Sequence, residues 1–330
     1  AVGLFAAAYR VMDTYLDNAH ADSWLLFTVL LGCYLIDLKR SQITNLIGVL
    51  LMVSAFWFKQ HGALFAIGAV LYLTWQEGWP KSWPYWVLAM ALGPVLYLAA
   101  PAWLFGPGFH YFTGEVPRRW SVFGLGTFGR LADFTVKFFL VLATIGFFAS
   151  ASALLRSGRR VNIWYVMFPV AVLSGFMGAL DPGGNNNVLI PMGTWFIITG
   201  VMGLRRLFDK FEMVERRGLY LLALGVSFAL LVYNPLSVVV SPQAAAAYQD
   251  MVGYLESLNG PVYAPWIGQL QDSHQFYPSV HWVALIDMIR GPGKHTDNHT
   301  NTRKLLEPVL NPKGEAYILM NYPLEGDVLL

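Results

Sequence analysis

Residues 43–75 read ITNLIGVLLMVSAFWFKQHGALFAIGAVLYLTW, two apolar runs joined by the short polar link Lys59–Gly62. A hydrocarbon core roughly 30 Å thick takes about 20 mostly apolar residues for each helical crossing. The apolar runs approach this length, and the four-residue link suits a turn between antiparallel helices. The stretch is therefore typical of a hairpin of membrane helices.

The same pattern fills the first three quarters of the chain. Only 13% of the residues are charged and 56% are apolar, whereas an average soluble domain has about 25% charged residues. The mean hydropathy is +0.48. The sequence predicts an all-α polytopic membrane protein with about eight transmembrane helices, in the runs Ser23–Ile36, Ile43–Phe58, Ala63–Trp75, Tyr85–Phe105, Phe134–Leu155, Val161–Leu180, Val188–Leu204 and Leu219–Val240.

Net charge and cysteine content say little more about the class of protein. The net charge is only +2, so nothing in it favours a nucleic-acid partner, and the single Cys33 cannot form an intrachain disulfide. No cleavable signal peptide is visible at the start of the chain. Because Ala1–Ala8 is apolar and is not preceded by Met, we expect it to be the end of a helix that begins upstream.

The distribution of Lys and Arg predicts an orientation. Basic residues gather in alternate short links, which marks those links as cytoplasmic: Lys39 and Arg40, then Lys81, then Arg156, Arg159 and Arg160, then the cations between Arg205 and Arg217. Lys59, the loop Gly106–Asp133 and the loop Asp181–Asn187 would then face outside, in a bacterial inner or plasma membrane. Cations kept on the disfavoured side at membrane depth are candidates for function.

The last residues differ from the rest. We divide the chain into a transmembrane bundle, residues 1–241, and a small extracytoplasmic α/β lobe, residues 242–330. In the lobe, Ala244–Leu258 predicts an amphipathic helix, Val262–Ala264 and Ala316–Met320 predict short buried strands, and Val283–Ile289 predicts a further helix.

A polar cluster precedes the run that starts at Ser23. It consists of Asp13, Asp17, His20 and Asp22. Because Asp17 to Asp22 spans a turn and a half of helix, these residues could share one polar cavity at the membrane edge, where Asp17, His20 and Asp22 would bind a substrate. The alternative is that they are solvated interface residues, with Asp22 as the N-cap of the helix.

Two outer segments carry groups suited to phosphate. Lys59 is followed at once by Gln60 and His61, and an ammonium can hold a phosphate as a point charge. In the aromatic outer loop, Arg118 and Arg119 offer guanidinium forks that bind phosphate through two hydrogen bonds. Snorkelling toward lipid headgroups is the competing explanation for these cations.

The loop Asp181–Asn187 combines an acid, two glycines and the amides of Asn185, Asn186 and Asn187. Amides can read sugar hydroxyls, although Asn and Gly also simply make turns. We expect Asp181 and the three asparagines to bind substrate, at the same outer pocket as Lys59. No cofactor is certain, and a divalent metal ion is left open.

Together these motifs resemble the GT-C superfamily of membrane glycosyltransferases that use polyprenyl-phosphate-linked sugars. Within it, the chain looks most like protein mannosyltransferases and the aminoarabinose transferase of lipid A. The resemblance is carried by short motifs spread over most of the chain: Tyr15–Trp24, Phe58–Gln60, Gly183–Pro191, and Gly260–Pro265 with Val283–Arg290. His20 stands where the family usually has Arg.

The resemblance implies transfer of a sugar from a polyprenyl-phosphate carrier to an extracytoplasmic acceptor. Lys59, Arg118 and Arg119 would neutralise the leaving phosphate, Asn185 and Asn187 would orient sugar or carrier, and Asp17, His20 and Asp22 would shape the acceptor side. The family's catalytic carboxylate lies in the first outer loop, which we expect upstream of Ala1. A lipid-linked glycan transporter and a non-catalytic membrane subunit are the alternatives.

Overall fold

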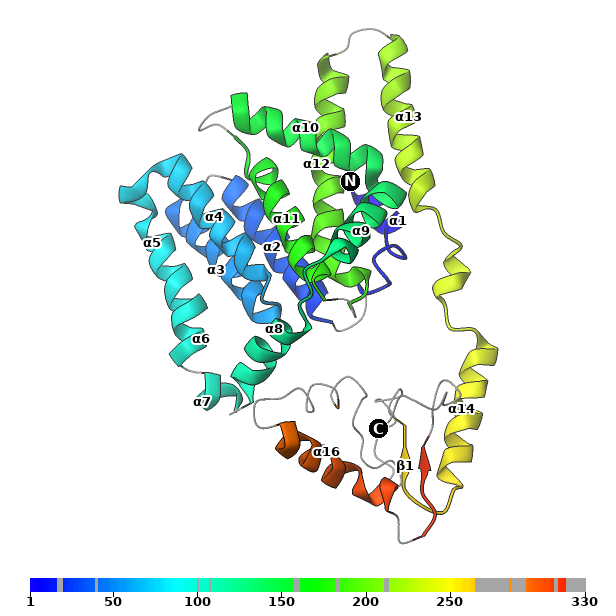
Figure 1. Ribbon diagram of the computed structural model, residues 1–330. Helices are drawn as coiled ribbons and strands as arrows, with labels where there is room; N and C mark the ends of the chain where they lie inside the picture. Colours follow the sequence, from blue (N-terminus) through cyan, green and yellow to red (C-terminus); the bar gives the residue numbers. More distant parts are fainter. Residues whose placement is uncertain are drawn as a thin grey trace. The chain divides into compact units, whose positions relative to one another are not determined.

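The computed structural model describes residues 1–16, 20–38, 41–99, 101–106, 108–156, 161–181, 184–210, 214–264, 285, 295–311 and 314–318. These residues are mostly helical, which confirms the prediction of an all-α bundle (Figure 1). The chain divides into two compact units. The first unit is Ala1–Pro107 with Trp120–Val238, and the second is Gly108–Arg119 with Val239–Leu330.

The first unit begins with the short helix α1 (Val2–Ala7) and then forms α2 (Ala21–Asp37), α3 (Gln42–Phe58) and α4 (Gly62–Glu77). A long, interrupted helix follows, made of α5 (Trp79–Met90), the π-helical turn η1 (Ala91–Val95), α6 (Leu96–Ala99) and α7 (Pro101–Phe105). Pro94 lies inside η1. Because proline cannot donate a backbone hydrogen bond, a wider turn at this point is the expected response.

The rest of the first unit contains α9 (Leu125–Phe134), η3 (Thr135–Phe139), α10 (Leu140–Arg156), α11 (Ile163–Ala179), η5 (Asn186–Leu189), α12 (Ile190–Lys210), α13 (Val214–Leu231) and η6 (Pro235–Val238). Side-chain caps fix two of the helix starts. The Ser41 hydroxyl accepts from the backbone N–H of Thr44, and the Asn162 carbonyl oxygen accepts from that of Trp164.

Three helical stretches among the described residues are long and apolar enough to cross a membrane: Trp79–Ala99, Leu125–Arg156 and Asn186–Asp209. A fourth would be the pair Arg217–Leu231 and Pro235–Glu256, if both belong to one span. The helices α2, α3, α4 and α11 have 16 or 17 residues, or about 25 Å of helix at 1.5 Å per residue. The membrane character of the chain is thus supported, whereas the full set of eight crossings stays a prediction.

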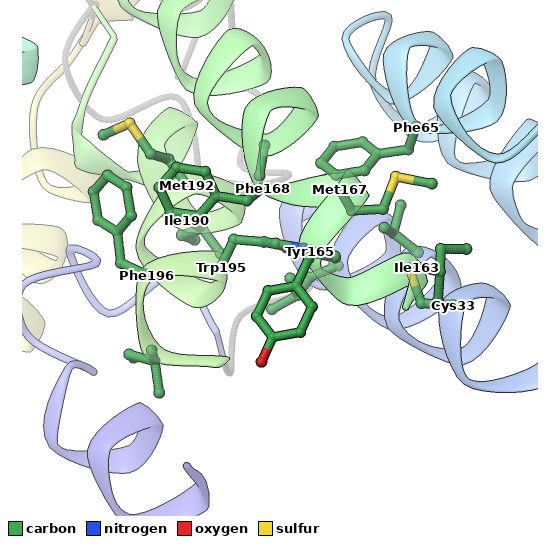
Figure 2. Close-up of a cluster of buried hydrophobic side chains, with 14 of the residues drawn as sticks. Cys33, Phe65, Ile163, Tyr165, Met167, Phe168, Ile190, Met192, Trp195 and Phe196 are labelled. Carbon is green, nitrogen blue, oxygen red and sulfur yellow. The ribbon is translucent and has the colours of Figure 1, made fainter. Parts of the chain in front are cut away.

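The core of the first unit lies where α2, α4, α11 and α12 meet. Figure 2 shows Phe65 from α4, Tyr165 and Phe168 from α11, and Trp195 from α12 among the side chains that fill it. Trp195 is completely buried, its ring centroid lies 5.4 Å from that of Phe65, and its indole N–H donates to the carbonyl of Trp164 over 3.1 Å. This packing holds the α11–α12 pair against the α2–α4 group.

In the second unit, η2 (Tyr111–Glu115) and α8 (Val116–Trp120) precede α14 (Pro242–Glu256), β1 (Val262–Tyr263), α16 (His295–Leu310) and β2 (Tyr317–Ile318). The two predicted strands form a parallel pair in which Val262 faces Tyr317. The predicted amphipathic helix is present as α14. The predicted helix Val283–Ile289 lies outside the described residues except for Leu285, which packs with Tyr263.

One glycine sets the geometry of the α3–α4 hairpin. A Cβ atom on Gly62 would lie 2.4 Å from the carbonyl carbon and oxygen of Ala55 in the preceding helix. Backbone meets backbone here, so no side-chain rotation could relieve the clash. The close approach brings the start of α4 against the end of α3, with Lys59 and His61 between them.

Gly62→Ala should therefore destabilise the protein by about 2 kcal/mol, because the hairpin must open to admit the methyl group. Gly129→Ala is the matched control, since a Cβ on this helical glycine of α9 meets nothing within 4 Å. Thermal unfolding in detergent measures both variants. Equal melting temperatures for the two would contradict the backbone clash.

Candidate functional site

Asp22 is the centre of a polar cluster at one end of the first unit. Its side chain is buried, only 1% exposed, yet it lies in the first turn of α2. The N-cap of α2 is His20, and the helix starts at Ala21. The interpretation of Asp22 as an N-cap is therefore wrong, because the carboxylate points into the protein and binds other side chains.

Both carboxylate oxygens of Asp22 have partners. The ammonium of Lys59 lies 2.6 Å from Oδ1, and the amide of Asn187 donates to Oδ2 over 2.9 Å. The Nδ1 atom of His20 also contacts Oδ2. A buried carboxylate is stable only when paired and hydrogen-bonded, and these three side chains meet that need. Lys59 is 23% exposed and His20 is 42% exposed, so the outer rim of the cluster reaches solvent.

The loop before α12 is fixed through its backbone. The guanidinium of Arg130, from α9, donates to the carbonyl of Asp181 over 3.1 Å, to that of Asn185 over 2.5 Å, and to that of Gly184. One side chain therefore holds three carbonyls of this loop. Asn187 follows immediately and is buried at Asp22.

A second contact joins this loop to the start of the chain. The backbone N–H of Asn186 donates to the carboxylate of Asp13, and the amide of Asn185 donates to the hydroxyl of Tyr15 over 3.2 Å. The Tyr15 ring also meets the His20 ring edge-on, with centroids 4.9 Å apart. The three asparagines thus contact Tyr15, Asp13 and Asp22 in turn.

The backbone is strained where it presents Asp13. Asp13 has φ 54° and Thr14 has φ 60°, and among the described residues these are the non-glycine residues with positive φ. The left-handed conformation costs about 1–2 kcal/mol for an ordinary residue. Two such residues in succession persist only when surrounding contacts hold them, and such strain concentrates at functional sites.

His61 lies behind Lys59 in the same hairpin. Burial and the neighbouring Lys59 ammonium lower the pKa of His61 from 6.5 to about 4, against the opposing effects of Asp22 and of a backbone hydrogen bond with Ser174. The imidazole is therefore neutral at pH 7. Its Nε2 atom is shielded from solvent and has no hydrogen-bond partner among the described residues.

Gln60 stands at the end of an apolar groove. A cavity of about 400 Å³ is lined by Gln60 and by residues of α3, α4, α5, η1 and α6. Apart from Gln60, the lining residues are apolar, except that Trp86 carries an indole N–H and Tyr97 a hydroxyl group. This volume falls in the range of roughly 300–1,000 Å³ found for small-molecule sites. The groove therefore begins at the residue next to Lys59 and continues along apolar helix faces.

The remaining predicted residues lie elsewhere. Arg118 and Arg119 are exposed residues of α8, in the second compact unit, where Arg119 lies 3.9 Å from the carboxylate of Glu115. Their predicted grouping with Lys59 stays a prediction. Asp17 lies outside the described residues. Asp181 contributes its backbone carbonyl to Arg130.

The structure also adds three residues that the sequence did not assign to the site: Asp13, Tyr15 and Arg130. Arg130 carried a signal, because it is one of the cations on the side that the charge distribution disfavours. Asp13 belongs to the polar cluster that precedes Ser23 and Tyr15 to the motif Tyr15–Trp24, but only the fold brings them to the asparagine loop. No group of three or more His, Cys, Asp or Glu side chains that could hold a metal is found in the described part of the chain.

Asp22→Ala should destabilise the protein by about 3 kcal/mol, because it strands the Lys59 ammonium and the Asn187 amide without their buried acceptor. Asp133→Ala is the matched control. Asp133 and Lys137 form an ion pair of similar length, 2.7 Å, but both are more than half exposed, so its loss should cost at most about 1 kcal/mol. Unfolding in detergent at pH 7 compares the two, and similar losses would show that Asp22 is not a structural centre.

His61 should make the folded state sensitive to acid. The folded chain takes up this proton near pH 4 and the unfolded chain near pH 6.5, so the unfolded state binds more protons between these values. The free energy of unfolding should therefore fall as the pH drops from about 6.5 to 4. His61→Asn should flatten this part of the melting profile, whereas the exposed control His110→Asn should not. Parallel profiles for all three proteins would refute the assignment.

No known protein family, curated protein or solved structure matches this chain. The resemblance to GT-C glycosyltransferases therefore rests on the sequence motifs themselves. What the chain does is best judged from the polar cluster around Asp22 and from the apolar groove that begins beside it.

Proposed function

We propose that the chain is a membrane glycosyltransferase of the GT-C type, which moves a sugar from a polyprenyl-phosphate carrier to an acceptor outside the cytoplasm. One observation carries the proposal. A partly exposed ammonium, held by a buried carboxylate and flanked by an asparagine loop, stands next to a long apolar groove. A carrier of this class has the same two parts, an anionic head and an apolar tail.

Lys59 is suited to bind the phosphate head of the carrier. An ammonium has three N–H donors, and the bond to Asp22 uses one of them. Because Asp22 holds this ammonium in place, a bound phosphate would already lie beside a positive charge. A cation placed in advance stabilises the negative charge that develops on the leaving oxygen, and so lowers the activation barrier for sugar transfer. Since Asp22 offsets part of the charge of Lys59, further cations are needed, and the resemblance assigns that role to Arg118 and Arg119.

The asparagine loop is suited to bind the sugar. Asn185 is exposed, whereas Asn187 is buried and anchors the loop on Asp22. Arg130 holds the backbone carbonyls of Asp181, Gly184 and Asn185, so the asparagines are presented from a fixed backbone. Rigid amides suit the recognition of hydroxyl groups, because little entropy is lost when they bind.

The groove supports the assignment of the tail. Its walls are apolar, and Gly93 lies among them in the π-helical turn, where an added Cβ meets nothing within 4 Å. A polyprenyl chain could follow this groove from Gln60 into the bilayer. The head would then lie at the membrane edge. The proposal keeps the eight predicted crossings and the extracytoplasmic C-terminal lobe.

The charged side chains argue for an enzyme rather than a transporter. In α2 and α4 the described acidic residues lie at the helix ends, at Asp22, Asp37 and Glu77, and α3 and α11 contain none. The main exception is Lys137, which pairs with Asp133 in the first half of the stretch Leu125–Arg156. A transporter for a charged lipid is expected to place ionisable groups at mid-membrane depth. Chemistry at the membrane edge fits the observed distribution better.

The double variant Asp22→Asn with Lys59→Gln tests the head without leaving a buried charge unpaired. Wild-type protein in detergent should bind polyprenyl phosphate more tightly than the polyprenol that lacks phosphate. Loss of a charge-assisted hydrogen bond costs about 1.5–3 kcal/mol, so the variant should lose roughly 10–100-fold of this preference. The control is Asp133→Asn with Lys137→Gln. An unchanged preference in the Asp22 and Lys59 variant would reject the proposal.

Gly93→Phe tests the tail separately. The new ring fits the open space of the groove and leaves the polar cluster untouched, so it should weaken binding of long-chain polyprenyl phosphate but not of a short-chain phosphate. Gly129→Phe, on the open face of α9, is the control. Equal effects on both chain lengths would place the tail elsewhere.

A further inference from the structure

A second polar cavity lies at the opposite end of α2–α4 from the Asp22 cluster. Its volume is about 670 Å³, and it is formed by the end of α2, the start of α3 and the α4–α5 turn. Asn45, Gln76, Glu77 and Lys81 supply polar groups to its wall, and Ile36 and Leu73 supply apolar ones. The proposed glycosyl transfer uses none of these residues.

One part of the wall has a carboxylate whose described donors are all neutral. The carboxylate of Glu77 accepts from the amide of Asn45 over 2.7 Å and from the hydroxyl of Tyr85 over 3.1 Å. Both donors are neutral, and no ion pair in the described part of the chain includes Glu77. Among the described residues, the carbonyl oxygen of Asn45 has no partner although the residue is only 6% exposed. A buried acceptor without a donor is costly, and this one lies beside the carboxylate of Glu77, which no described cation neutralises.

Another part of the wall lacks acceptors. The amide nitrogen of Gln76 is buried and has no partner among the described residues, and the exposed Lys81 supplies an ammonium to the same cavity. Lys81 and Glu77 are four residues apart, a spacing that forms ion pairs within a helix. They do not pair here, because Gly78, with φ 82°, ends α4 and turns the chain into α5. Two opposite charges are therefore kept apart on one cavity.

We propose that this cavity binds a zwitterion made of a primary ammonium and a phosphate, as in the phosphoethanolamine headgroup. The ammonium supplies N–H donors to Glu77 and to the orphan oxygen of Asn45. The phosphate oxygens accept from Lys81 and from the amide of Gln76. Because Ile36 and Leu73 line the same cavity and the surrounding helices are apolar, phosphatidylethanolamine of the bilayer is the expected source. Free phosphoethanolamine presents the same groups.

Lipid retention tests the proposal. The full chain is purified in detergent and incubated with equal amounts of phosphatidylethanolamine, phosphatidylcholine and phosphatidylglycerol, and the retained lipids are counted by native mass spectrometry. Phosphatidylcholine has a cation without N–H donors, and phosphatidylglycerol has no cation. Wild-type protein should retain phosphatidylethanolamine at least tenfold better than either. Equal retention of all three would overturn the proposal.

Single substitutions locate the binding. Glu77→Gln keeps the size of the side chain and one acceptor oxygen but removes the charge, and should abolish the preference for phosphatidylethanolamine. Lys81→Gln, at an exposed position that does not threaten folding, should weaken retention of phosphatidylethanolamine through its phosphate. The exposed residues Asp209 and Arg205 supply the controls Asp209→Asn and Arg205→Gln. A preference that survives both Glu77→Gln and Lys81→Gln would refute this site.

Calorimetry with free phosphoethanolamine separates the two sources. Binding as tight as that of the lipid, and lost in Glu77→Gln, would assign the cavity to a soluble zwitterion. Weak or absent binding beside strong lipid retention would assign it to the membrane. Both results concern only the cavity at Glu77. They are therefore independent of whether Lys59 binds polyprenyl phosphate.

Discussion

The buried carboxylate of Asp22 imposes the constraint on which the arrangement of the first unit depends. A carboxylate that is 1% exposed must be paired and hydrogen-bonded. Its partners come from the α3–α4 hairpin and from the loop before α12, so meeting this need fixes three helix ends together. Gly62 allows the hairpin to close tightly enough for Lys59 to reach, and Arg130 holds the loop that carries Asn187.

Much of this could be predicted from the sequence, for physical reasons that are easy to name. Long apolar runs predict helices, and most of their described residues are helical, although the run Leu219–Val240 leaves the α-helix after Leu231. Lys59 and the asparagine loop stand out because a cation and a run of amides are unusual between apolar segments. Their meeting at one cluster follows from the alternation of antiparallel helices, which brings every second connection to the same end of a bundle.

The other contacts of the site depend on the tertiary structure, and no periodic pattern in the sequence predicts them. Asp22 was compatible with a capping role, and only the helix start at Ala21 shows that its carboxylate turns inward. The hydroxyl of Tyr15 and the carboxylate of Asp13 meet residues some 170 positions away, a pairing that no local pattern encodes. Likewise, the apolar groove depends on the π-helical turn at Pro94, and the charge separation of Glu77 from Lys81 depends on one positive φ at Gly78.

The wide sequence separation within the Asp22 cluster has a consequence for biosynthesis. Lys59 follows Asp22 by 37 residues, and Asn187 follows it by 165. During translation the Asp22 carboxylate is therefore made well before the Lys59 ammonium that pairs with it. The third partner arrives only after most of the bundle has been made. The polar cluster can therefore close only after the chain has been made as far as Asn187, so α2, α3 and α4 form before the contact that joins Asp22 to the loop before α12.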